Sequence, residues 1–189
     1  MDSNKVKQVF EALVKMYIQR PGIEELMKML EESDFYTAPA STRFHGAEEG
    51  GLCQHSINVG KQLFALADVY AKDVYSKETL AIVSLFHDIC KIGCYKIEMR
   101  NKKDENGRWV QVPFYTFEED FAFGGHGSKS MFLVMQHVTL TPEEASAINC
   151  HMGFANESNI NAVSSAYEHN LLAWMLHVAD EAATYIDKV

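Results

Sequence analysis

The stretch Ser84–Gly93 reads SLFHDICKIG and places a histidine and an aspartate side by side in an otherwise apolar run. Burying His87 and Asp88 is costly unless something pairs with them, and a metal ion suits a neutral imidazole and a carboxylate together. Lys91 follows Asp88 by three residues, which on a helix places its ammonium group on the same face as the carboxylate. The stretch therefore predicts that other segments of the chain supply further metal ligands.

Around this stretch, apolar residues recur at the spacing of a helix over most of the chain. Helices are predicted at residues 3–20, 23–32, 52–70, 77–91, 128–137, 142–152 and 167–186, with loops at 33–51 and 153–165. Ser76 and Thr141 are predicted N-caps, and Thr141 with Glu144 at the third helical position has the pattern of a capping box. These elements indicate an all-α fold.

Residues 95–117 differ from the rest of the chain in composition. Tyr95–Lys102 and Arg108–Phe117 are rich in aromatic and β-branched residues, and the segment between them contains Asn-Gly. Two such runs separated by Asn-Gly are typical of a β-hairpin. The predicted fold class is therefore an all-α helical bundle with a small inserted β-hairpin.

Length and charge limit what the protein can do. The 189 residues suit one domain with a sizeable core, and no apolar run approaches the ~20 residues of a membrane span. The N-terminus does not resemble a signal peptide, so we expect a cytoplasmic protein with no membrane association. The four cysteines form no CxxC pair and are expected to be reduced thiols. The net charge of −9 argues against binding of extended nucleic acid but leaves a small anionic substrate open.

Four histidines and two aspartates stand where metal ligands could lie. They are His55, His87, Asp88, His126, His151 and Asp180. Six such ligands exceed the three or four that one catalytic metal takes, and they suit two metals that share a bridging carboxylate. Imidazole and carboxylate ligands together favour Fe, Mn, Co, Ni or Zn over Mg²⁺. His177, three residues before Asp180, either orients that carboxylate or packs in the core.

The order of these six residues resembles the HD superfamily of metal-dependent phosphohydrolases, over roughly residues 36–187. HDICK is similar to the HD-I-G-K box of that family with Cys90 in place of glycine. GGLCQHSINVG and LLAWMLHVADEAATYID are similar to the helices that carry its first histidine and last aspartate. Pro39-Ala40, His45 and the glycines before His55 look most like the HD domain of Gram-positive 3′–5′ exoribonucleases. Those enzymes carry an added OB-type domain, which we do not expect here.

The resemblance implies one HD domain at residues 1–189, with N-terminal helices at 1–35, an HD core at 36–187 and the hairpin inserted at 95–117. It also implies a division of the ligands between two metals. His55, His87, Asp88 and Asp180 would hold the first metal, and Asp88 would bridge to a second metal held by His126 and His151. Relatives often have a His-His pair where this chain has Cys150-His151, so the second site would be weaker or completed by water.

The first functional hypothesis is a metal-dependent phosphohydrolase acting on a nucleotide or related small phosphorylated substrate. Asp88 and Lys91 would be catalytic, with Lys91 facing the phosphate. The candidate substrate contacts are Arg43, His45, Lys91, Ser128 and Lys129. The hairpin, with Tyr95, Trp109, Phe114 and Tyr115, would be either a wall that stacks a base or a segment packed on the body or on a second subunit.

Two alternatives remain open. An HD-fold di-iron oxygenase uses the same kinds of ligand, and a cation such as Lys91 suits its substrates too. A non-catalytic nucleotide-binding module is less compatible with a complete set of ligands. The native metal, the choice between phosphomonoesterase and phosphodiesterase, and the formation of a homo-oligomer are not decided by the sequence.

Overall fold

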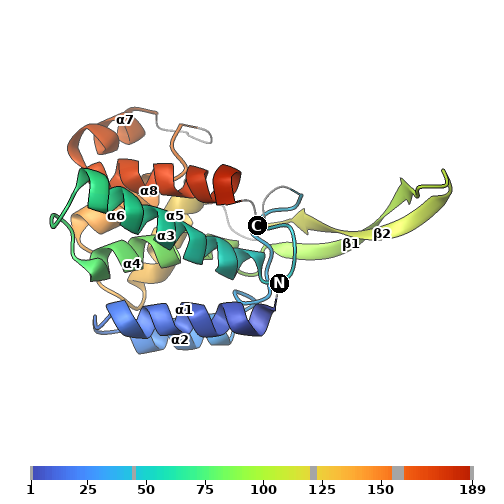
Figure 1. Cartoon of the computed structure of the whole chain (residues 1–189), viewed down its shortest axis with the longest axis horizontal. Helices are drawn as coiled ribbons and strands as arrows, with labels where there is room; N and C mark the ends of the chain where they lie inside the picture. The colour runs from blue at the N-terminus through green and yellow to red at the C-terminus, as the bar shows by residue number, and fades with distance from the viewer. Residues whose placement is uncertain (1, 44–45, 120–122, 155–159, 188–189) are drawn as a thin grey trace.

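The computed structural model describes residues 2–43, 46–119, 123–154 and 160–187, and these residues form a helical body from which one β-hairpin projects (Figure 1). The helices are α1 (Ser3–Tyr17), α2 (Ile23–Glu31), α3 (Gly51–Tyr70), α4 (Lys77–Phe86), α5 (His126–Met135), α6 (Pro142–Cys150), α7 (Ile160–His169) and α8 (Leu171–Ala182). A 3₁₀ turn, η1 (Ile89–Lys91), follows α4, and a π turn, η2 (Ala183–Asp187), follows α8. The predicted fold class is confirmed.

Helix α3 organises the body because it packs against α1, α4 and α8. Its residues Leu52, Val59 and Leu63 are fully buried. At Gly60 an added Cβ would lie 3.3 Å from Ser84 Oγ, so this glycine allows α3 and α4 to approach closely. The close crossing brings His55 on α3 near the end of α4.

Helix α4 ends at Phe86, so the prediction of a helix continuing to Lys91 was wrong. The His87 ring nitrogen Nδ1 lies 2.8 Å from the Ser84 carbonyl oxygen, which a continuing helix would offer to the Asp88 backbone N–H. Asp88 leaves the helical conformation, with φ −115° and ψ 15°. Lys91 still reaches Asp88 with a 2.7 Å contact, because η1 turns the chain back towards the carboxylate.

The C-terminal part of the fold also differs from the prediction. Residues 160–165, expected in a loop, belong to α7, and a break at Asn170 replaces the single helix expected at 167–186. The Asn170 side chain accepts a hydrogen bond from the Leu172 backbone N–H and donates one to the Glu143 carbonyl oxygen. These bonds make Asn170 the N-cap of α8, which carries Asp180.

Helix starts at α4 and α6 follow the expected capping chemistry. Ser76 Oγ accepts from the Thr79 backbone N–H, and Thr141 forms the complete capping box with Glu144. Glu144 has no exposed side-chain surface and also binds Arg20, whose Nη1 and Nη2 lie 2.5 and 3.0 Å from its two oxygens. This ion pair joins the segment after α1 to the start of α6.

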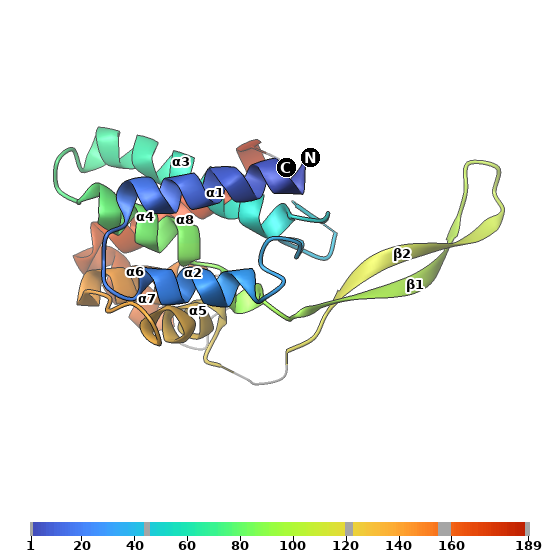
Figure 2. The same cartoon turned by 90° about the horizontal axis from the view of Figure 1, so that it is seen from below.

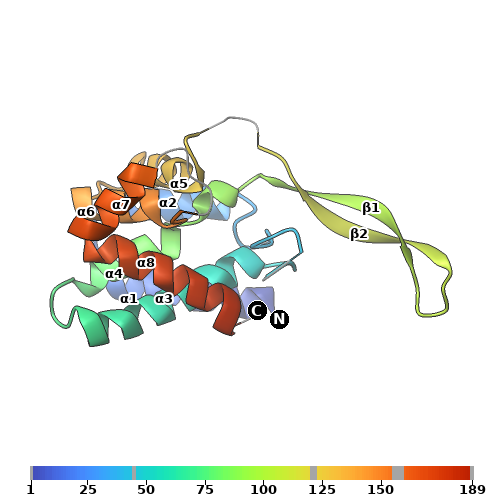
Figure 3. The same ribbon diagram turned by 90° about the horizontal axis from the view of Figure 1, so that it is seen from above.

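Strands β1 (Tyr95–Lys103) and β2 (Trp109–Phe117) form the predicted antiparallel hairpin, in register from the pair Tyr95 and Phe117 to the pair Lys103 and Trp109. The hairpin extends away from the helices instead of lying on them (Figures 2 and 3). Most of β1 is exposed. Most of the hairpin therefore does not pack on the body of its own chain, and its packing on a second subunit stays a prediction.

Within the described ranges, no helix has both the length and the hydropathy that crossing a bilayer requires.

Candidate metal centre

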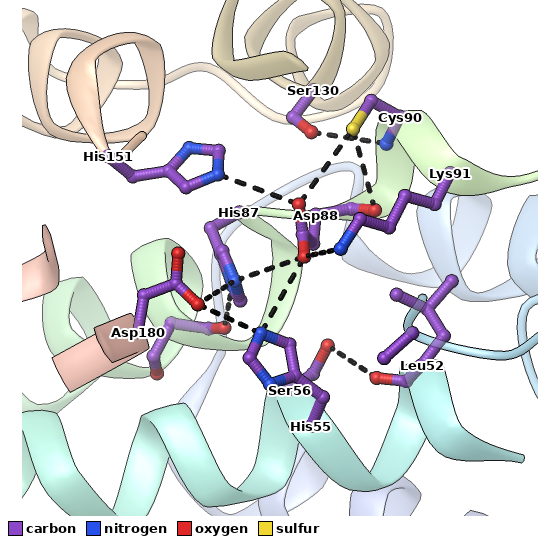
Figure 4. Close-up of polar contacts among 12 residues, drawn as sticks. Leu52, His55, Ser56, His87, Asp88, Cys90, Lys91, Ser130, His151 and Asp180 are labelled. Carbon is purple, nitrogen blue, oxygen red and sulfur yellow. Dashed lines mark hydrogen bonds and ion pairs between the residues drawn. The ribbon is translucent and has the colours of Figure 1, made fainter. Parts of the chain in front are cut away.

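Side chains from α3, α5 and α8 and from the segments that follow α4 and α6 come together in the helical body. Figure 4 shows His55, His87, Asp88, His151 and Asp180 of this cluster. Three overlapping groups have potential ligand atoms within 4.8 Å of one another: His55, His87 and Asp88; His87, His151 and Asp180; and Asp88, Cys90 and His126. The structure thus brings together all six residues that the sequence indicated, and it adds Cys90. Their role as metal ligands stays a prediction.

Asp88 lies at the middle of the cluster and presents its two oxygens to different partners. Oδ2 lies 2.7 Å from Lys91 Nζ, 3.5 Å from His87 Nε2 and 3.6 Å from His55 Nε2. Oδ1 lies 3.5 Å from His151 Nε2 on the other side (Figure 4). A carboxylate that faces two groups of nitrogen atoms in this way has the arrangement of a bridging ligand.

Asp180 completes the Oδ2 side of the cluster. Its Oδ1 lies 3.0 Å from His55 Nε2 and 3.9 Å from His87 Nε2. Burial alone would raise the pKa of Asp180, but the neighbouring His55 and His87 outweigh it and hold that pKa below its usual range. The carboxylate is therefore ionised, as a metal ligand must be.

Backbone carbonyls orient two of the imidazoles. Nδ1 of His87 lies 2.8 Å from the Ser84 carbonyl oxygen, and Nδ1 of His151 lies 2.8 Å from the Ile148 carbonyl oxygen. A carbonyl only accepts, so each Nδ1 carries the proton when the ring is neutral and Nε2 keeps its lone pair. Each ring is thereby fixed with its free nitrogen towards Asp88, which is how a metal-binding histidine is normally held.

Unsatisfied nitrogen atoms indicate that a cation fits here. Among the described residues, His87 Nε2, His126 Nδ1 and His151 Nε2 are buried without a hydrogen-bond partner. Buried polar atoms are nearly always paired, so three such atoms around one carboxylate require an explanation. Imidazole nitrogens and carboxylate oxygens are the donors that Mn, Fe, Co, Ni and Zn accept. The donor set is therefore suited to a transition-metal ion.

The charge states of the central residues support the same conclusion. Burial lowers the pKa of His87 to about 4, so its imidazole is neutral. Burial would raise the pKa of Asp88, but Lys91 and His87 outweigh burial and hold it well below the usual range. For His151 the contact with Asp88 outweighs burial and raises the pKa, so a cation bound there competes with a proton.

Of the predicted substrate contacts, Lys91 binds directly to a residue of the cluster. Ser128 Oγ donates to the Asn149 side chain at 2.8 Å, and Lys129 Nζ lies 2.9 Å from Glu119 Oε1 and 3.3 Å from Cys94 Sγ. Arg43 is exposed in the loop before α3, and His45 lies outside the described residues. Lys91 binds Asp88 directly. Contacts of these residues with substrate stay predictions.

The hairpin contributes to the surroundings of the site only at its base. The Phe117 ring lies 5.7 Å from the His126 ring, and Tyr95 packs between Phe117 and Tyr115. Trp109 lies at the far end of the hairpin, next to the turn, and 69% of its surface is exposed. The expectation that Trp109 helps to form a wall of the site was wrong. Phe117 lies beside His126, and Tyr95 is close enough to Lys91 and Asp88 to interact with both charges.

His177 has a partner that the sequence did not indicate. Its Nδ1 lies 2.8 Å from the His151 backbone carbonyl oxygen, and its ring stacks on Tyr167 at 5.6 Å. His177 therefore positions the end of α6, where His151 is located, and not the Asp180 carboxylate. Of the two expectations for His177, the contacts agree with packing, through the Tyr167 ring, and not with orientation of Asp180, because tertiary packing and not helical spacing sets these contacts.

Removing this support should weaken metal binding. We expect His177→Ala to lower metal affinity roughly tenfold, because loss of a group that orients a ligand costs about that much. Isothermal titration with Mn²⁺ or Zn²⁺ measures the change. The matched control is His169→Ala, whose side chain is 72% exposed, and equal affinities in the two variants would contradict the assignment.

Gly127 explains how α5 comes close to α6. An added Cβ at this residue would lie 2.2 Å from the Asn149 carbonyl oxygen and 2.5 Å from the Ile148 carbonyl oxygen. Only glycine permits this approach, which places His126 beside the end of α6. A histidine followed by glycine in the sequence is the signal that could have indicated this contact.

A methyl group at this position should separate the two helices. We expect Gly127→Ala to lower the free energy of unfolding by about 2 kcal/mol, as overpacked sites commonly do, and to weaken metal binding. Gly124→Ala is the control, because among the residues that the structure describes an added Cβ there meets only Ser128 Oγ, at 3.4 Å. Urea unfolding of the two variants makes the comparison, and wild-type stability in Gly127→Ala would refute the packing argument.

Part of the chain is similar in sequence to a curated phosphodiesterase. Over 94 residues the chain is 36% identical to the dihydroneopterin 2′,3′-cyclic phosphate phosphodiesterase of Methanocaldococcus jannaschii. The aligned segment covers 48% of this chain and 35% of that protein, so this chain spans about a third of the length of the relative. No family model matches the sequence. No solved structure matches it either.

Proposed function

We propose that the protein is a metal-dependent phosphohydrolase that cleaves a phosphate ester of a nucleotide or related small phosphorylated compound. The observation that carries the proposal is the buried cluster around Asp88, in which unpaired imidazole nitrogens face both carboxylate oxygens. The similarity to a protein named as a cyclic phosphate phosphodiesterase supports the same class of reaction.

The ligands divide into two sets that share Asp88. His55, His87, Asp88 and Asp180 would hold one ion, and Asp88 would bridge to a second ion held by His126 and His151. The potential ligand atom of His151 also lies within 4.8 Å of those of His87 and Asp180, so the two sets adjoin. Such ions supply Lewis-acid stabilisation of charge on phosphoryl oxygens and activation of water. The native metal is proposed to be Fe, Mn, Co, Ni or Zn, since the donors are nitrogen and oxygen.

Lys91 supplies the fixed positive charge of the proposed site. Its Nζ is 2.7 Å from Asp88 Oδ2, and the residue is 9% exposed. Burial would lower the pKa of Lys91, but Asp88 outweighs burial and raises it, so the side chain remains an ammonium ion. A charged donor held in a buried place stabilises negative charge that develops on a phosphate. Lys91 is thus proposed to stabilise the charge on the substrate phosphate, while Asp88 holds its ammonium group in position.

The loop that carries Arg43 is proposed to form one side of the substrate site. The Tyr95 hydroxyl donates to the Ala40 carbonyl oxygen at 3.0 Å, which attaches this loop to the start of β1. Arg43 and His45 would contact the substrate from here. Ser128 and Lys129 would contact it from the start of α5. The residues 36–187 would then act as the metal-binding core of a single domain at 1–189, with the hairpin at 95–117 as an insertion.

The experiment combines metal content with a panel of substrates. Protein purified without chelator is analysed for metals, and then incubated with Mn²⁺, Fe²⁺, Co²⁺, Ni²⁺ or Zn²⁺ and nucleoside monophosphates, 2′,3′-cyclic and 3′,5′-cyclic nucleotides. We expect phosphate-ester cleavage with at least one ion and no uptake of O₂. O₂ uptake without hydrolysis would favour the oxygenase, and nucleotide binding without turnover or metal would favour the non-catalytic module.

A further inference from the structure

Cys90 lies against Asp88, at the place where the HD-I-G-K box that this stretch resembles has glycine. Its Sγ lies 3.9 Å from Asp88 Oδ1 and 3.7 Å from the Asp88 carbonyl oxygen, and the residue is 2% exposed (Figure 4). The Ser130 hydroxyl accepts from the Cys90 backbone N–H at 3.1 Å, which fixes the turn that carries the thiol. The sulfur is thus held on the Oδ1 side of the carboxylate.

Two histidines lie near Cys90 and Asp88, and one of them is directed at the same carboxylate oxygen as the sulfur. His126 belongs to one group with Asp88 and Cys90, in which the potential ligand atoms lie within 4.8 Å of one another. His151 is fully buried, and its Nε2 lies 3.5 Å from Asp88 Oδ1 without a hydrogen-bond partner among the described residues. An unpaired, buried nitrogen directed at the same oxygen as the sulfur is independent support for a bound cation here.

The spacing of these atoms fits coordination of one ion. Ligands at the usual distances of about 2.0–2.3 Å from a zinc-like ion cannot lie more than roughly 4.6 Å apart, and tetrahedral ligands lie closer. The 3.9 Å between Cys90 Sγ and Asp88 Oδ1 is within this limit. By contrast, Cys94, four residues further on, directs its thiol to the Cys90 carbonyl oxygen at 3.3 Å and has Lys129 Nζ at 3.3 Å.

We propose that Cys90 is a thiolate ligand of the second metal ion, together with Asp88, His126 and His151. This inference rests on the proposed function, because it presumes that the cluster binds metal. It gives the second site four protein ligands, with sulfur in place of the imidazole that Cys150 does not provide. On binding, the S–H bond breaks, the proton passes to solvent, and the sulfur lone pair binds the cation.

A thiolate changes which ions the second site accepts. Sulfur is a soft donor that favours Zn²⁺, Fe²⁺ or Co²⁺ over the harder Mn²⁺. The first site, with only nitrogen and oxygen donors, has no such preference from sulfur. The two sites are therefore expected to differ in metal selectivity, and a mixed pair of ions is the expected state when several metals are available.

Cobalt provides the test, because a thiolate ligand gives Co²⁺ an intense charge-transfer band in the near ultraviolet. The full chain is titrated with Co²⁺ while absorbance and bound metal are recorded. We expect two equivalents to bind and the band to grow with only one of them. Cys90→Ser should lose the band, keep the equivalent bound at the first site, and bind the other at least about 100-fold more weakly, since even indirect ligand support contributes 10–100-fold. The control Cys94→Ala should keep the band.

The outcomes separate the two proposals. Three results would overturn the assignment of Cys90 but not the metal-dependent function. They are two bound equivalents without the band, binding of one equivalent only, and a band that persists in Cys90→Ser. No Co²⁺ binding by the wild type would overturn the metal-dependent function and the assignment with it. Cys90→Gly, which restores the residue of relatives, serves if the serine variant does not fold. X-ray absorption of the zinc-loaded wild type should also show sulfur at ~2.3 Å, and needs no variant.

Discussion

Replacing Asp88 with alanine is expected to lower the rate of phosphate-ester cleavage by roughly 10³-fold or more and to prevent binding of a second metal ion. Asp88 is the residue whose two oxygens face both groups of nitrogen atoms, so its loss affects both sides of the cluster. Metal-ion stabilisation of a reaction is worth several kcal/mol, and each ~1.4 kcal/mol corresponds to a factor of ten in rate. Rates are measured with the preferred metal and substrate, and bound metal is measured on the same samples.

Stability must be separated from activity in this experiment. Asp88→Ala leaves the buried Lys91 ammonium group without its 2.7 Å partner, which is destabilising in its own right. The double variant Asp88→Ala/Lys91→Met removes both charges and should recover stability without recovering activity. Asp68→Ala, at an exposed residue of α3, is the matched control and should behave as wild type. Full activity and metal content in Asp88→Ala would remove Asp88 from the proposed site.

Replacing Arg20 with methionine is expected to destabilise the protein by about 3 kcal/mol. Its partner Glu144 lies in the first turn of α6, and His151 of the candidate site follows the other end of that helix. Glu144 has no exposed side-chain surface, and both of its oxygens bind Arg20. Removing one partner of a buried ion pair leaves the other charge uncompensated, which typically costs 3–5 kcal/mol. Urea unfolding measures the effect.

The double variant Arg20→Met/Glu144→Gln provides the comparison. It removes both charges, so it should recover a substantial part of the stability lost in Arg20→Met. Lys28→Met, at an exposed residue of α2, is the control and should change the free energy of unfolding by less than about 0.5 kcal/mol. If Arg20→Met were no less stable than this control, the ion pair would have no role in stability.

The same pair predicts how stability depends on pH. Burial would raise the pKa of Glu144, but the hydrogen bonds from Arg20 and Thr141 outweigh burial and lower it below the usual 4.5. A lowered folded-state pKa means that the unfolded chain binds the proton more tightly. The contribution of Glu144 is therefore complete above about pH 4.5 and is lost as the pH falls through the folded-state value. The wild type should lose stability on acidification more steeply than the double variant.

Local signals were sufficient for much of the fold. Ser76 and Thr141 predicted the starts of α4 and α6, because an N-cap acts within its own turn. Asn106-Gly107 predicted the turn between β1 and β2 for the same reason: Gly107 has φ +77°, which glycine adopts without strain. Such features depend on a few neighbouring residues, so the sequence alone indicates them.

The errors arose where a side-chain contact overrides the preference that periodicity or propensity indicates. The side chain of His87 binds the Ser84 carbonyl oxygen and helps to end α4 before Asp88, whereas periodicity alone extended the helix to Lys91. Asn170 caps α8 and also binds the Glu143 carbonyl oxygen on α6, a contact that no local pattern reveals. The projection of the hairpin likewise depends on how β1 leaves η1, and strand propensity carries no information about that direction.

The candidate site was indicated by residue type and order, but its geometry was not. The six histidines and aspartates come from five helices or helix ends, and only the folded chain shows that Asp88 directs its two oxygens to different partners. Cys90 was recognised as a departure from glycine, yet its position beside Oδ1 was not foreseen. The supporting contact of His177 with the His151 carbonyl oxygen was also outside what spacing can predict.

The antiparallel register of the hairpin has a consequence for how the chain reaches its native topology. The Glu118 backbone N–H donates to the Cys94 carbonyl oxygen at 2.8 Å, so the two ends of the insertion meet where it leaves the body. Once the strands pair, residues 95–117 add little to the entropy of closing the loop between η1 and α5, because only residues 92–94 and 118–125 then act as the connection. The hairpin can therefore gain or lose residues during evolution, one from each strand at a time. The distance between Asp88 and His126 is then preserved.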